Sequence, residues 1–514
     1  MVRTPAWSRT STPPQTHPRT RPVPTGGWRP GAILVLTALL LVVFCGFLAF
    51  GLDVGYMLLV RTQLQTAADA AAMAATDALR QSGSVTSAKQ AAYDIAEMNH
   101  VGGSDLHLDV NSDVVFGRRT YDSATSQWVF QANQTPYDSV RVQARRTGTG
   151  NALGVSPDGA VGLFFGPVLG VASFESAASA TATYLPRDIA LAIDLSGSMH
   201  YDSSIVREPE RGVSAVDDSL EAIWQNLGSH TYGNMNNWST LQTITSTNYT
   251  TVKSTLGITS VAYPYAAGSW NEYLDFVSAK SGASAKRQHI IDRGYRYKYG
   301  LKTFTDYLQW IRSRYTDTPP LPTSPEQPIK ALKDAVDIMM DYLATLNTEE
   351  WVALATYDDT ARTETISGVT GLTSNLAAAN ARMQQLGAGH YSRQTNIGDG
   401  IKQARLALTG ATARPQARKV MVLMTDGEAN RPSGNITSDK NYAVQEAQYA
   451  ADQDITIYTV SFGALSDQAL MGQIATIGHG THYHVEGYDV AQYTADLQQV
   501  FINISSNRPL ALTN

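Results

Sequence analysis

A short run of oxygen-bearing side chains follows one strongly apolar segment of the chain. Residues 187–194 form a nearly continuous apolar run that ends in Asp194, as expected for a buried parallel strand that delivers a side chain at its carboxyl end. Ser196 and Ser198 follow, and Gly197 between them allows a tight turn. One carboxylate and two hydroxyls from one turn are hard oxygen ligands, which suit Mg²⁺ and not zinc.

Further ligands for such a cation would have to come from other parts of the chain. Residues 419–425 form a second apolar run, which leads into Asp426 and Gly427. Between the two runs, Thr395 stands near the start of an amphipathic segment at 396–409. Ligand sites in an open α/β sheet lie outside the carboxyl ends of the strands, so these pieces can converge on one ion. Each motif alone is also compatible with an ordinary turn, and their order and placement together favour a site.

These residues, in the segments Asp-Leu-Ser-Gly-Ser and Thr-Asp-Gly, resemble the von Willebrand factor type A domain with its metal-ion-dependent adhesion site. The resemblance implies that Ser196, Ser198 and Thr395 offer hydroxyl ligands. It implies that Asp194 and Asp426 act directly or through water. It further implies Mg²⁺ as the ion, with Mn²⁺ or Ca²⁺ as alternatives, and an open coordination position that takes an acidic group of a protein partner.

The elements that must position these side chains alternate between strands and helices. The pattern predicts strands at 351–358, 419–425, 455–463 and 482–485, and helices at 326–346, 372–385, 396–409, 440–452, 466–477 and 489–504. Such alternation indicates an α/β fold with a doubly wound, mostly parallel, Rossmann-like sheet. The type A resemblance covers residues 186–505, with a break.

The break is an insertion at residues 200–324, directly after the Asp-Leu-Ser-Gly-Ser loop. It contains half of the eight tryptophans of the chain, and structureless loops of this length are uncommon in compact domains. Apolar residues at helical spacing over 301–315 also indicate a folded subdomain. Basic and aromatic residues interleave over 293–302, which suits a nucleic-acid or sugar platform. An alternating β-strand with one solvated face is the favoured interpretation of that segment.

Other groups that could do chemistry are weaker candidates. Three histidines lie in or just before the last predicted strand, away from Asp194 in the expected order, which favours a structural role: His479, His482 and His484. Asp202 stands where integrin-type domains hold part of a second metal site, but Tyr201 replaces the neighbouring acid. No nucleophile has an identifiable base, and no GxxxxGK[ST] phosphate-binding loop is present. We therefore expect no catalytic residue and no enzymatic activity.

The amino end carries a candidate membrane anchor. Residues 1–30 hold five arginines and no acid, which together with many Pro, Thr and Ser residues predicts a disordered tail. Residues 31–52 are uncharged and as a helix would be about 33 Å long, enough to span a bilayer. Arginines flank only the amino side, so the positive-inside rule places the tail in the cytoplasm and everything after Asp53 outside. A cleaved signal peptide is the alternative, but its apolar core would be shorter.

The span continues into an alanine-rich helical segment at 53–80. With the span, the sequence DVGYMLLVRTQLQTAADAAAMAA resembles the amino-terminal segment of TadE/TadG-like proteins of the tight-adherence (Flp) pilus assembly system. The resemblance implies a single-pass protein of the bacterial inner membrane with pilus components as partners. The spacing of the small residues in this helix is by itself also compatible with a plain amphipathic stalk.

Residues 81–185 are expected to form a helix and a small β-rich spacer, because the apolar period changes to two after residue 105. Residues 162–182 again resemble the segment that comes after the anchor in TadG-type proteins. We expect them to hold the next domain off the membrane or to dock to a partner. Residues 506–514 are expected to form a carboxyl-terminal tail.

Composition excludes several classes of protein. With 514 residues, the chain is long enough for several structural units, and 43% hydrophobic residues argue against global disorder. The net charge of -6 argues against nucleic-acid binding. The one cysteine, Cys45, lies in the span and excludes an intrachain disulfide, a redox CxxC and a zinc ribbon.

Together these features predict a membrane-anchored, Mg²⁺-dependent adhesion or protein-binding module of a Tad-like pilus assembly or secretion apparatus. The alternative is a structural, minor-pilin-like or stalk component in which the metal only stabilises the loop.

Overall fold

The computed structural model describes residues 30–122, 125, 127–135, 137–279, 288–312, 320–345, 350–389, 393–486, 490–506 and 510–512. The chain divides into two compact units. The first comprises residues 1–67, 97–108 and 144–178, and the second comprises residues 68–96, 109–143 and 179–514. The predicted tail lies outside the described residues, apart from Pro30.

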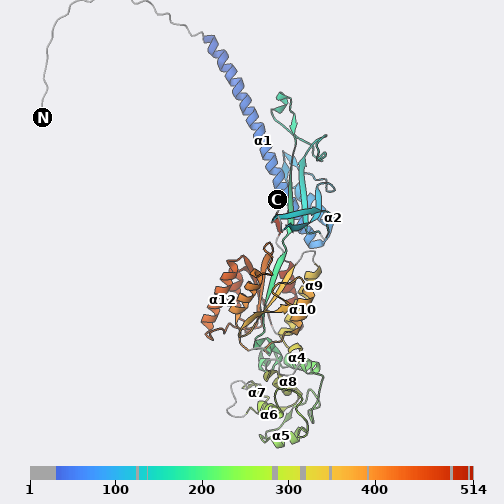
Figure 1. Ribbon diagram of the computed structural model, residues 1–514, viewed down its shortest axis with the longest axis vertical. Coiled ribbons are helices and arrows are strands. Elements are labelled where there is room, and N and C mark those ends of the chain that lie inside the picture. Colours follow the sequence, from blue (N-terminus) through green and yellow to red (C-terminus); the bar gives the residue numbers. More distant parts are fainter. Residues whose placement is uncertain are drawn as a thin grey trace, which may run out of the picture. The chain divides into compact units, whose positions relative to one another are not determined.

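The first unit is built on the amino-terminal part of helix α1 (Pro30–Ser82), which Figure 1 shows as one continuous helix. Among the described residues, α1 is the one helix long and apolar enough to cross a membrane. The large apolar side chains from Ile33 to Leu52 are exposed, as lipid-facing side chains would be. The predicted span and the alanine-rich segment are therefore parts of a single helix.

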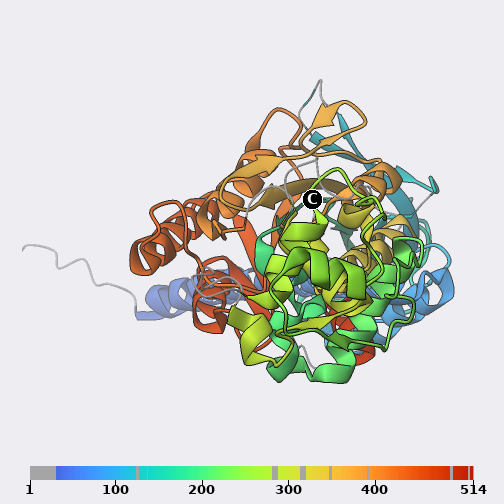
Figure 2. The same cartoon turned by 90° about the horizontal axis from the view of Figure 1, so that it is seen from below.

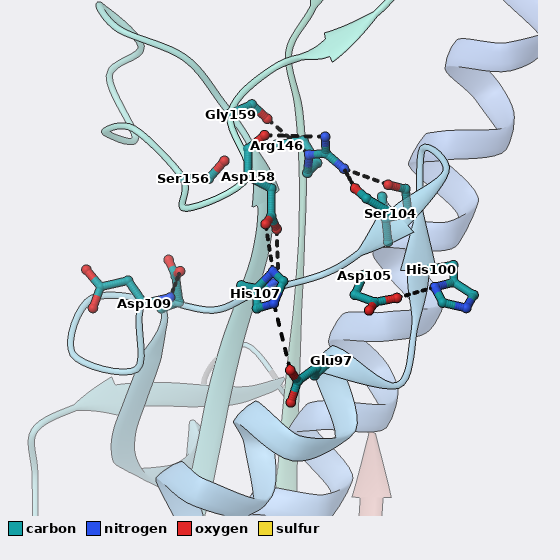
Figure 3. A network of polar contacts seen from close by, with 12 residues as sticks. Glu97, His100, Ser104, Asp105, His107, Asp109, Arg146, Ser156, Asp158 and Gly159 are labelled. Atoms are coloured by element: carbon teal, nitrogen blue, oxygen red, sulfur yellow. Dashed lines mark hydrogen bonds and ion pairs between the residues drawn. The ribbon is translucent and has the colours of Figure 1, made fainter.

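Short hairpins complete the first unit: β1 (His100–Val101), β2 (Ser104–Asp105), β6 (Val161–Gly162), the 3-10 helix η1 (Gly166–Leu169) and β7 (Ser173–Phe174). Figure 3 shows the polar network that connects two of its segments. His107 Nδ1 lies 2.7 Å from Asp158 Oδ1, and this hydrogen bond raises the pKa of the imidazole. Arg146 donates to the carbonyl of Val101 and to Ser104 Oγ. These contacts fix the β1–β2 hairpin to Arg146 and the segment after β2 to Asp158.

The second unit begins with the end of α1, helix α2 (Val85–Glu97) and a five-stranded sheet in the order β19-β8-β5-β3-β4. The strands are β3 (Val114–Asp122), β4 (Gln127–Ala132), β5 (Ser139–Arg146), β8 (Ser176–Tyr184) and β19 (Leu510–Leu512). Tyr184 Oη donates to the carbonyl of Thr76 at 2.9 Å, so α1 packs on this sheet. Leu510 pairs with Tyr184, and three residues of the expected tail therefore form a strand.

The larger sheet of the second unit has six strands in the order β13-β12-β9-β16-β17-β18. They are β9 (Arg187–Asp194), β12 (Trp351–Tyr357), β13 (Ala361–Thr363), β16 (Arg418–Thr425), β17 (Ile455–Phe462) and β18 (His479–Val485). All neighbours are parallel except β13, which pairs antiparallel to β12. The predicted doubly wound, mostly parallel sheet is confirmed.

Helices cover both faces of this sheet, as Figure 1 shows for α12 on one side and α9 and α10 on the other. Ile189 and Leu191 of β9 face a core completed by α9 (Ile329–Thr345), α10 (Leu376–Gln385) and α14 (Val490–Ser506). Ala190 and Ala192 face the opposite core, completed by α11 (Ile397–Thr409), α12 (Ile436–Ala451) and α13 (Gln468–Ile477). Every residue of β9 is buried, because both of its faces are covered.

The insertion is a folded subdomain at one end of this sheet, shown in green in Figures 1 and 2. Its helices are α3 (Glu208–Arg211), α4 (Val213–Asn226), α5 (Tyr249–Thr255), α6 (Trp270–Ser278), α7 (Gln288–Asp292) and α8 (Leu301–Trp310). Aromatic side chains dominate its core, where the Phe304 ring lies 5.1 Å from the rings of both Trp270 and Tyr273. This cluster lets the subdomain bury its own apolar surface.

One expectation for the insertion is wrong. Residues 293–302 do not form a long alternating strand: only β11 (Lys298–Tyr299) pairs, with β10 (Gln242–Thr243), and α8 begins at Leu301. Tyr297 has a positive φ of 64°, which interrupts an extended chain. Tyr295 and Tyr299 are buried in the aromatic core on either side of this turn. The aromatic–basic alternation therefore reflects burial of the tyrosines and not a regular strand.

A buried ion pair anchors the start of the central strand. Arg187 and Glu350 are 1% and 0% exposed, and Arg187 Nη2 lies 3.2 Å from Glu350 Oε1. Glu350 also accepts the backbone N–H of Arg187 at 3.0 Å, while Arg187 donates to the carbonyl of Ser505 at 2.9 Å. The pair thus joins β9 to the start of β12 and to the end of α14.

We predict that Glu350→Ala lowers the free energy of unfolding of the second unit by about 3–5 kcal/mol, because it leaves a buried guanidinium without its carboxylate. The matched control is Asp334→Ala, which removes an ion pair with Lys330 whose two side chains are 36% and 37% exposed. The control should cost about 0.5 kcal/mol or less. Urea unfolding followed by tryptophan fluorescence measures both, and equal effects would contradict the assigned role of the buried pair.

Candidate metal centre

The register of the sheet brings two acids to the same edge. Ile193 of β9 pairs with Met424 of β16, so Asp194 and Asp426 emerge from neighbouring parallel strands. The Asp194 carboxylate is fully buried and receives two hydrogen bonds. The backbone N–H of Ser196 donates to its Oδ1 at 2.7 Å, and Thr425 Oγ1 donates to its Oδ2 at 2.6 Å. These donors hold the carboxylate in one orientation.

The three hydroxyl groups lie against this pair of acids. Ser196 Oγ and Ser198 Oγ are 3.1 Å apart, and Ser198 Oγ donates to Asp426 Oδ1 at 2.6 Å. A Cβ atom at Gly427 would lie 3.3 Å from Thr395 Oγ1 and 3.4 Å from Ser198 Oγ. The tertiary structure therefore brings all five sequence-predicted residues together, and glycine at 427 keeps the space between their hydroxyls open.

Thr395 is held in place by its neighbours on two loops. Its backbone N–H donates to Asn430 Oδ1 at 2.8 Å, and the N–H of Asn430 donates back to its carbonyl at 3.0 Å. Asn396 caps helix α11 by accepting from the N–H of Asp399 at 3.1 Å. The loop that carries Thr395 is thus tied both to α11 and to the loop after β16.

The donor set fits a small, hard cation. In octahedral Mg²⁺ sites the metal–oxygen distance is about 2.0–2.1 Å, so adjacent ligand oxygens lie about 3 Å apart. The spacings within the cluster, 2.6 Å and 3.1 Å, are close to this value. No group of three or more His, Cys, Asp or Glu able to hold a metal occurs among the described residues. A metal here would therefore depend on hydroxyl ligands.

Burial and mutual repulsion disfavour the charged forms of the two acids. Burial raises the pKa of Asp194 to about 6, and the negative charge of Asp358 adds to this, against the hydrogen bonds from Ser196 and Thr425. Burial first, and then the charge of Asp194, raise the pKa of Asp426 well above its usual range, against the Ser198 hydrogen bond and Arg207. A divalent cation between the acids would relieve both effects.

The insertion fixes the end of the loop that follows β9, residues 195–205, here called the metal loop. This role was not predicted from the sequence. Asp306 on α8 is buried, accepts from Ser204 Oγ at 2.6 Å and accepts from the N–H of Ile205 at 3.0 Å. Gln309 Nε2, one helical turn further, donates to the carbonyl of Ser203 at 2.8 Å. The sequence did contain a signal for this role: Asp306 is an acidic residue on the apolar face of a predicted helix, where a carboxylate needs a buried partner.

A cavity of about 490 Å³ adjoins the centre on the insertion side. Its lining includes Tyr201 from the metal loop, Arg393 from the Thr395 loop, and Gln309 and Trp310 from α8. The Arg393 guanidinium lies 5.1 Å from the centre of the Trp310 ring. Gln309 is 1% exposed, and its Oε1 has no hydrogen-bond partner among the described residues. The cavity thus brings a cation and an aromatic ring next to the five-residue cluster, with a buried amide oxygen behind its lining.

The weaker sequence candidates lie elsewhere or are already paired. β16 and β17 separate β18 from β9, so His482 and His484 are distant from Asp194 in the sheet. Both histidines contact Ser461 on the adjacent strand. Asp202 lies 3.8 Å from Arg211, which also donates to its carbonyl. The contacts of His482, His484 and Asp202 are therefore those of residues with a structural role.

The comparisons with known proteins agree with this architecture. Residues 324–501 match the family model of the von Willebrand factor type A domain, residues 31–78 that of Flp pilus-assembly TadE/G-like proteins, and residues 68–182 that of Tad-like Flp pilus-assembly proteins. The chain therefore carries a von Willebrand factor type A domain behind a TadE/G-like and Tad-like amino-terminal region. The type A match begins after the insertion, and the pairing of β9 with β12 and β16 shows that residues 187–194 supply its central strand.

Among solved structures, the von Willebrand factor type A protein from Catenulispora acidiphila is 22% identical, with 35% of this chain and 38% of that chain covered and a TM-score of 0.28. The PilB minor pilin from Streptococcus sanguinis is 10% identical over 77% of this chain and 87% of that chain, with a TM-score of 0.33. The vWF domain of the type V pili tip protein Mfa5 from Porphyromonas gingivalis is 13% identical over 64% and 98%, with a TM-score of 0.28. The search of curated proteins finds no match.

We predict that the second unit loses stability in EDTA as the pH rises from about 4 to 7. The folded state raises the pKa of Asp194 from 3.8 to about 6, so it binds more protons than the unfolded state in this window. The stability present at low pH is therefore lost as the pH rises through the folded pKa, by about 3 kcal/mol for this group.

Thermal unfolding of the full chain in detergent, followed by tryptophan fluorescence, measures this pH dependence. Asp194→Asn should flatten it, and Mg²⁺ should reduce it in the unchanged protein. A pH profile in EDTA that is the same for the variant and the unchanged protein would contradict the prediction.

Proposed function

We propose that this protein is a membrane-anchored binding module of a Tad-like pilus assembly or secretion apparatus, in which the type A domain holds Mg²⁺ and grips a carboxylate of a protein partner. The observation that carries the proposal is the cluster of Asp194, Ser196, Ser198, Thr395 and Asp426 at one edge of the sheet. It supplies several neutral hydroxyls and only two acids. Mn²⁺ and Ca²⁺ are alternatives to Mg²⁺.

The balance of charge in the cluster supports recognition of an acid. Hydroxyl ligands do not neutralise a divalent cation, and Asp194 already accepts hydrogen bonds on both carboxylate oxygens. A cation held by such ligands stays electrophilic and supplies a coordination position for an incoming carboxylate. The five residues hold and orient the cation, and no group in the cluster is arranged as a nucleophile with a base. We therefore propose a binding protein and not an enzyme.

The cavity beside the cluster offers a second contact for the same partner. Tyr201 and Arg393 line the cavity, and they lie three residues after Ser198 and two residues before Thr395. A side chain next to the metal-binding acid of a partner would therefore reach Arg393 and Trp310 in the cavity. The insertion thereby contributes to the choice of partner.

The amino-terminal region supports a location in the bacterial inner membrane. α1 is long and apolar enough to span a bilayer, and the matched Tad families are pilus-assembly families. The arginines of residues 1–30 place the amino end in the cytoplasm by the positive-inside rule, with the type A domain on the other side. Pilus components are then the proposed class of partner.

A structural role is the second candidate, because α1 and the Tad-like region alone can serve assembly. In that case the protein is a minor-pilin-like or stalk component in which the metal only stabilises the loop. Deletion of residues 3–52 would then stop assembly, whereas Ser196→Ala would have little effect.

The binding proposal predicts that the immobilised full chain retains pilus-assembly proteins in Mg²⁺ and releases them in EDTA. Asp194→Ala and Ser198→Ala should abolish retention, because each removes part of the cation site. Asp452→Ala, a change at an exposed acid at the end of α12, is the matched control and should leave retention intact. Amidation of the partner's carboxyl groups should abolish retention by the unchanged chain. Retention that survives both Asp194→Ala and EDTA would contradict the proposal.

The insertion should set the affinity for the cation. Asp306→Asn weakens the acceptor that holds Ser204 and Ile205, so we expect Mg²⁺ to bind about 10- to 100-fold more weakly. The matched control is Asp218→Asn at an exposed position of α4. Titration of Mg²⁺ against the melting temperature of the full chain measures both. An unchanged affinity in Asp306→Asn would show that α8 does not position the loop.

A further inference from the structure

A second surface of the molecule is apolar, exposed and unconnected with the metal centre. The segment from Leu163 to Phe174, here called the apolar loop, contains no charged residue and includes η1 and β7. Its large side chains point outward: Val168 is 85% exposed, Leu169 76% and Phe164 67%. A contiguous exposed patch of this kind on a folded protein marks a contact surface.

The apolar loop lies against the part of α1 that precedes and includes Asp53. Cys45, Ala49 and Phe50 of α1 line a cavity of about 510 Å³ together with Val168 and Leu169 of the loop. Along a helix, Cys45 and Ala49 lie about 12 Å and 6 Å before Asp53. The loop therefore reaches back alongside the membrane-spanning stretch and does not stop where that stretch was expected to end.

Asp53 holds the loop in this position. Its carboxylate is 7% exposed and accepts the backbone N–H of Phe164 at 2.9 Å and that of Phe165 at 3.1 Å. The Tyr56 ring, one turn further along α1, lies 4.8 Å from the Phe164 ring. The first charge after the span is thus covered by the loop, and it satisfies two donors that would otherwise have no partner.

Several other backbone N–H groups of the loop find their acceptors within the loop. Leu163 donates to the carbonyl of Ala172, Val168 to that of Phe165, and Val171 to that of Gly166, at 3.0 Å in each case. Gly170, in the left-handed region with φ of 82°, caps η1. Irregular backbone is tolerated at membrane depth only where its polar groups are satisfied within the protein. Six N–H groups of the loop, those of residues 163–165, 168, 170 and 171, thus have acceptors within the protein, which lowers the cost of placing this irregular backbone beside acyl chains while its side chains face outward.

The lipid-facing surface of α1 is also continuous past Asp53. Val54, Met57, Leu58 and Leu59 are exposed, and the next charge along the chain is Arg61. The exposed side chains of the loop extend this surface sideways from the helix. Within residues 33–59 and 163–174, no exposed charge interrupts the two surfaces, since Asp53 is covered.

We propose that the apolar loop inserts into the acyl chains of the bilayer beside α1, in the leaflet that contains the carboxyl-terminal end of the span 31–52. Asp53 is the buried group that holds the loop there. The membrane anchor then consists of α1 together with the apolar loop and not of α1 alone. This inference rests on membrane insertion of α1 and is independent of the metal centre.

The test uses the full chain with Cys45→Ala, reconstituted into phosphatidylglycerol–phosphatidylethanolamine vesicles at a low protein-to-lipid ratio. Nitroxide labels are placed singly at Leu169→Cys in the loop, Leu41→Cys on α1 and Ile436→Cys on the exposed start of α12. Collision with lipid-soluble oxygen should exceed collision with a water-soluble nickel chelate several-fold at positions 169 and 41. The reverse should hold at position 436.

A water-exposed label at 169 with a lipid-exposed label at 41 would overturn the proposal while leaving the anchor intact. A label at 169 that is shielded from both reagents would show protein contact and would also overturn it. A water-exposed label at 41 would contradict insertion of α1 itself.

A second variant tests the role of Asp53. In Asp53→Ala, the label at 169 should lose its lipid exposure because the N–H groups of Phe164 and Phe165 lose their acceptor. The label at 436 is the internal control and should not change. Unchanged lipid exposure at 169 would show that Asp53 does not fasten the loop.

Discussion

The buried carboxylate of Asp194 is the constraint on which the type A domain depends. A negative charge removed from water needs donors or a cation close by, and here Ser196 donates to it from the loop after β9 and Thr425 from the end of β16. These donors converge only because β9 lies between β12 and β16, buried on both faces. The sheet order, the alanines that let helices approach one face of β9, and the ion pair at its start all serve to place this one group.

The insertion also helps to position the loop that carries Ser196 and Ser198. A chain of this length beside the candidate ligands could move them apart, yet the insertion has a buried aromatic core of its own. From this subdomain, Asp306 and Gln309 reach back to the end of the metal loop. Arg312 and Glu326, both fully buried, form an ion pair where the chain returns to the type A sheet. The insertion is therefore part of the site and not an appendage.

The anchor uses the same physical device in a different environment. Asp53, like Asp194, is a covered carboxylate held by hydrogen bonds: it accepts two backbone N–H groups, whereas Asp194 accepts one backbone N–H and one hydroxyl. In the type A domain the held carboxylate stands beside a second buried acid, Asp426. On α1 the Asp53 carboxylate supplies acceptors for two N–H groups of the apolar loop, which lowers the cost of placing that loop in a membrane.

The sequence by itself determined the elements whose signals are local. The parallel strands and the helices from 326 to 504 follow from apolar periodicity, and the five residues of the candidate centre are proposed from motifs at strand ends; the short edge strand β13 was not predicted. Long-range contacts decided the rest. Residues 510–512 become a strand only because β8 offers them an edge, and residues 293–302 turn because Tyr295 and Tyr299 are drawn into the aromatic core. Asp306 and Asp53 acquire their roles from backbone groups more than a hundred residues away, and pairing at that range depends on the folded core and leaves no local pattern.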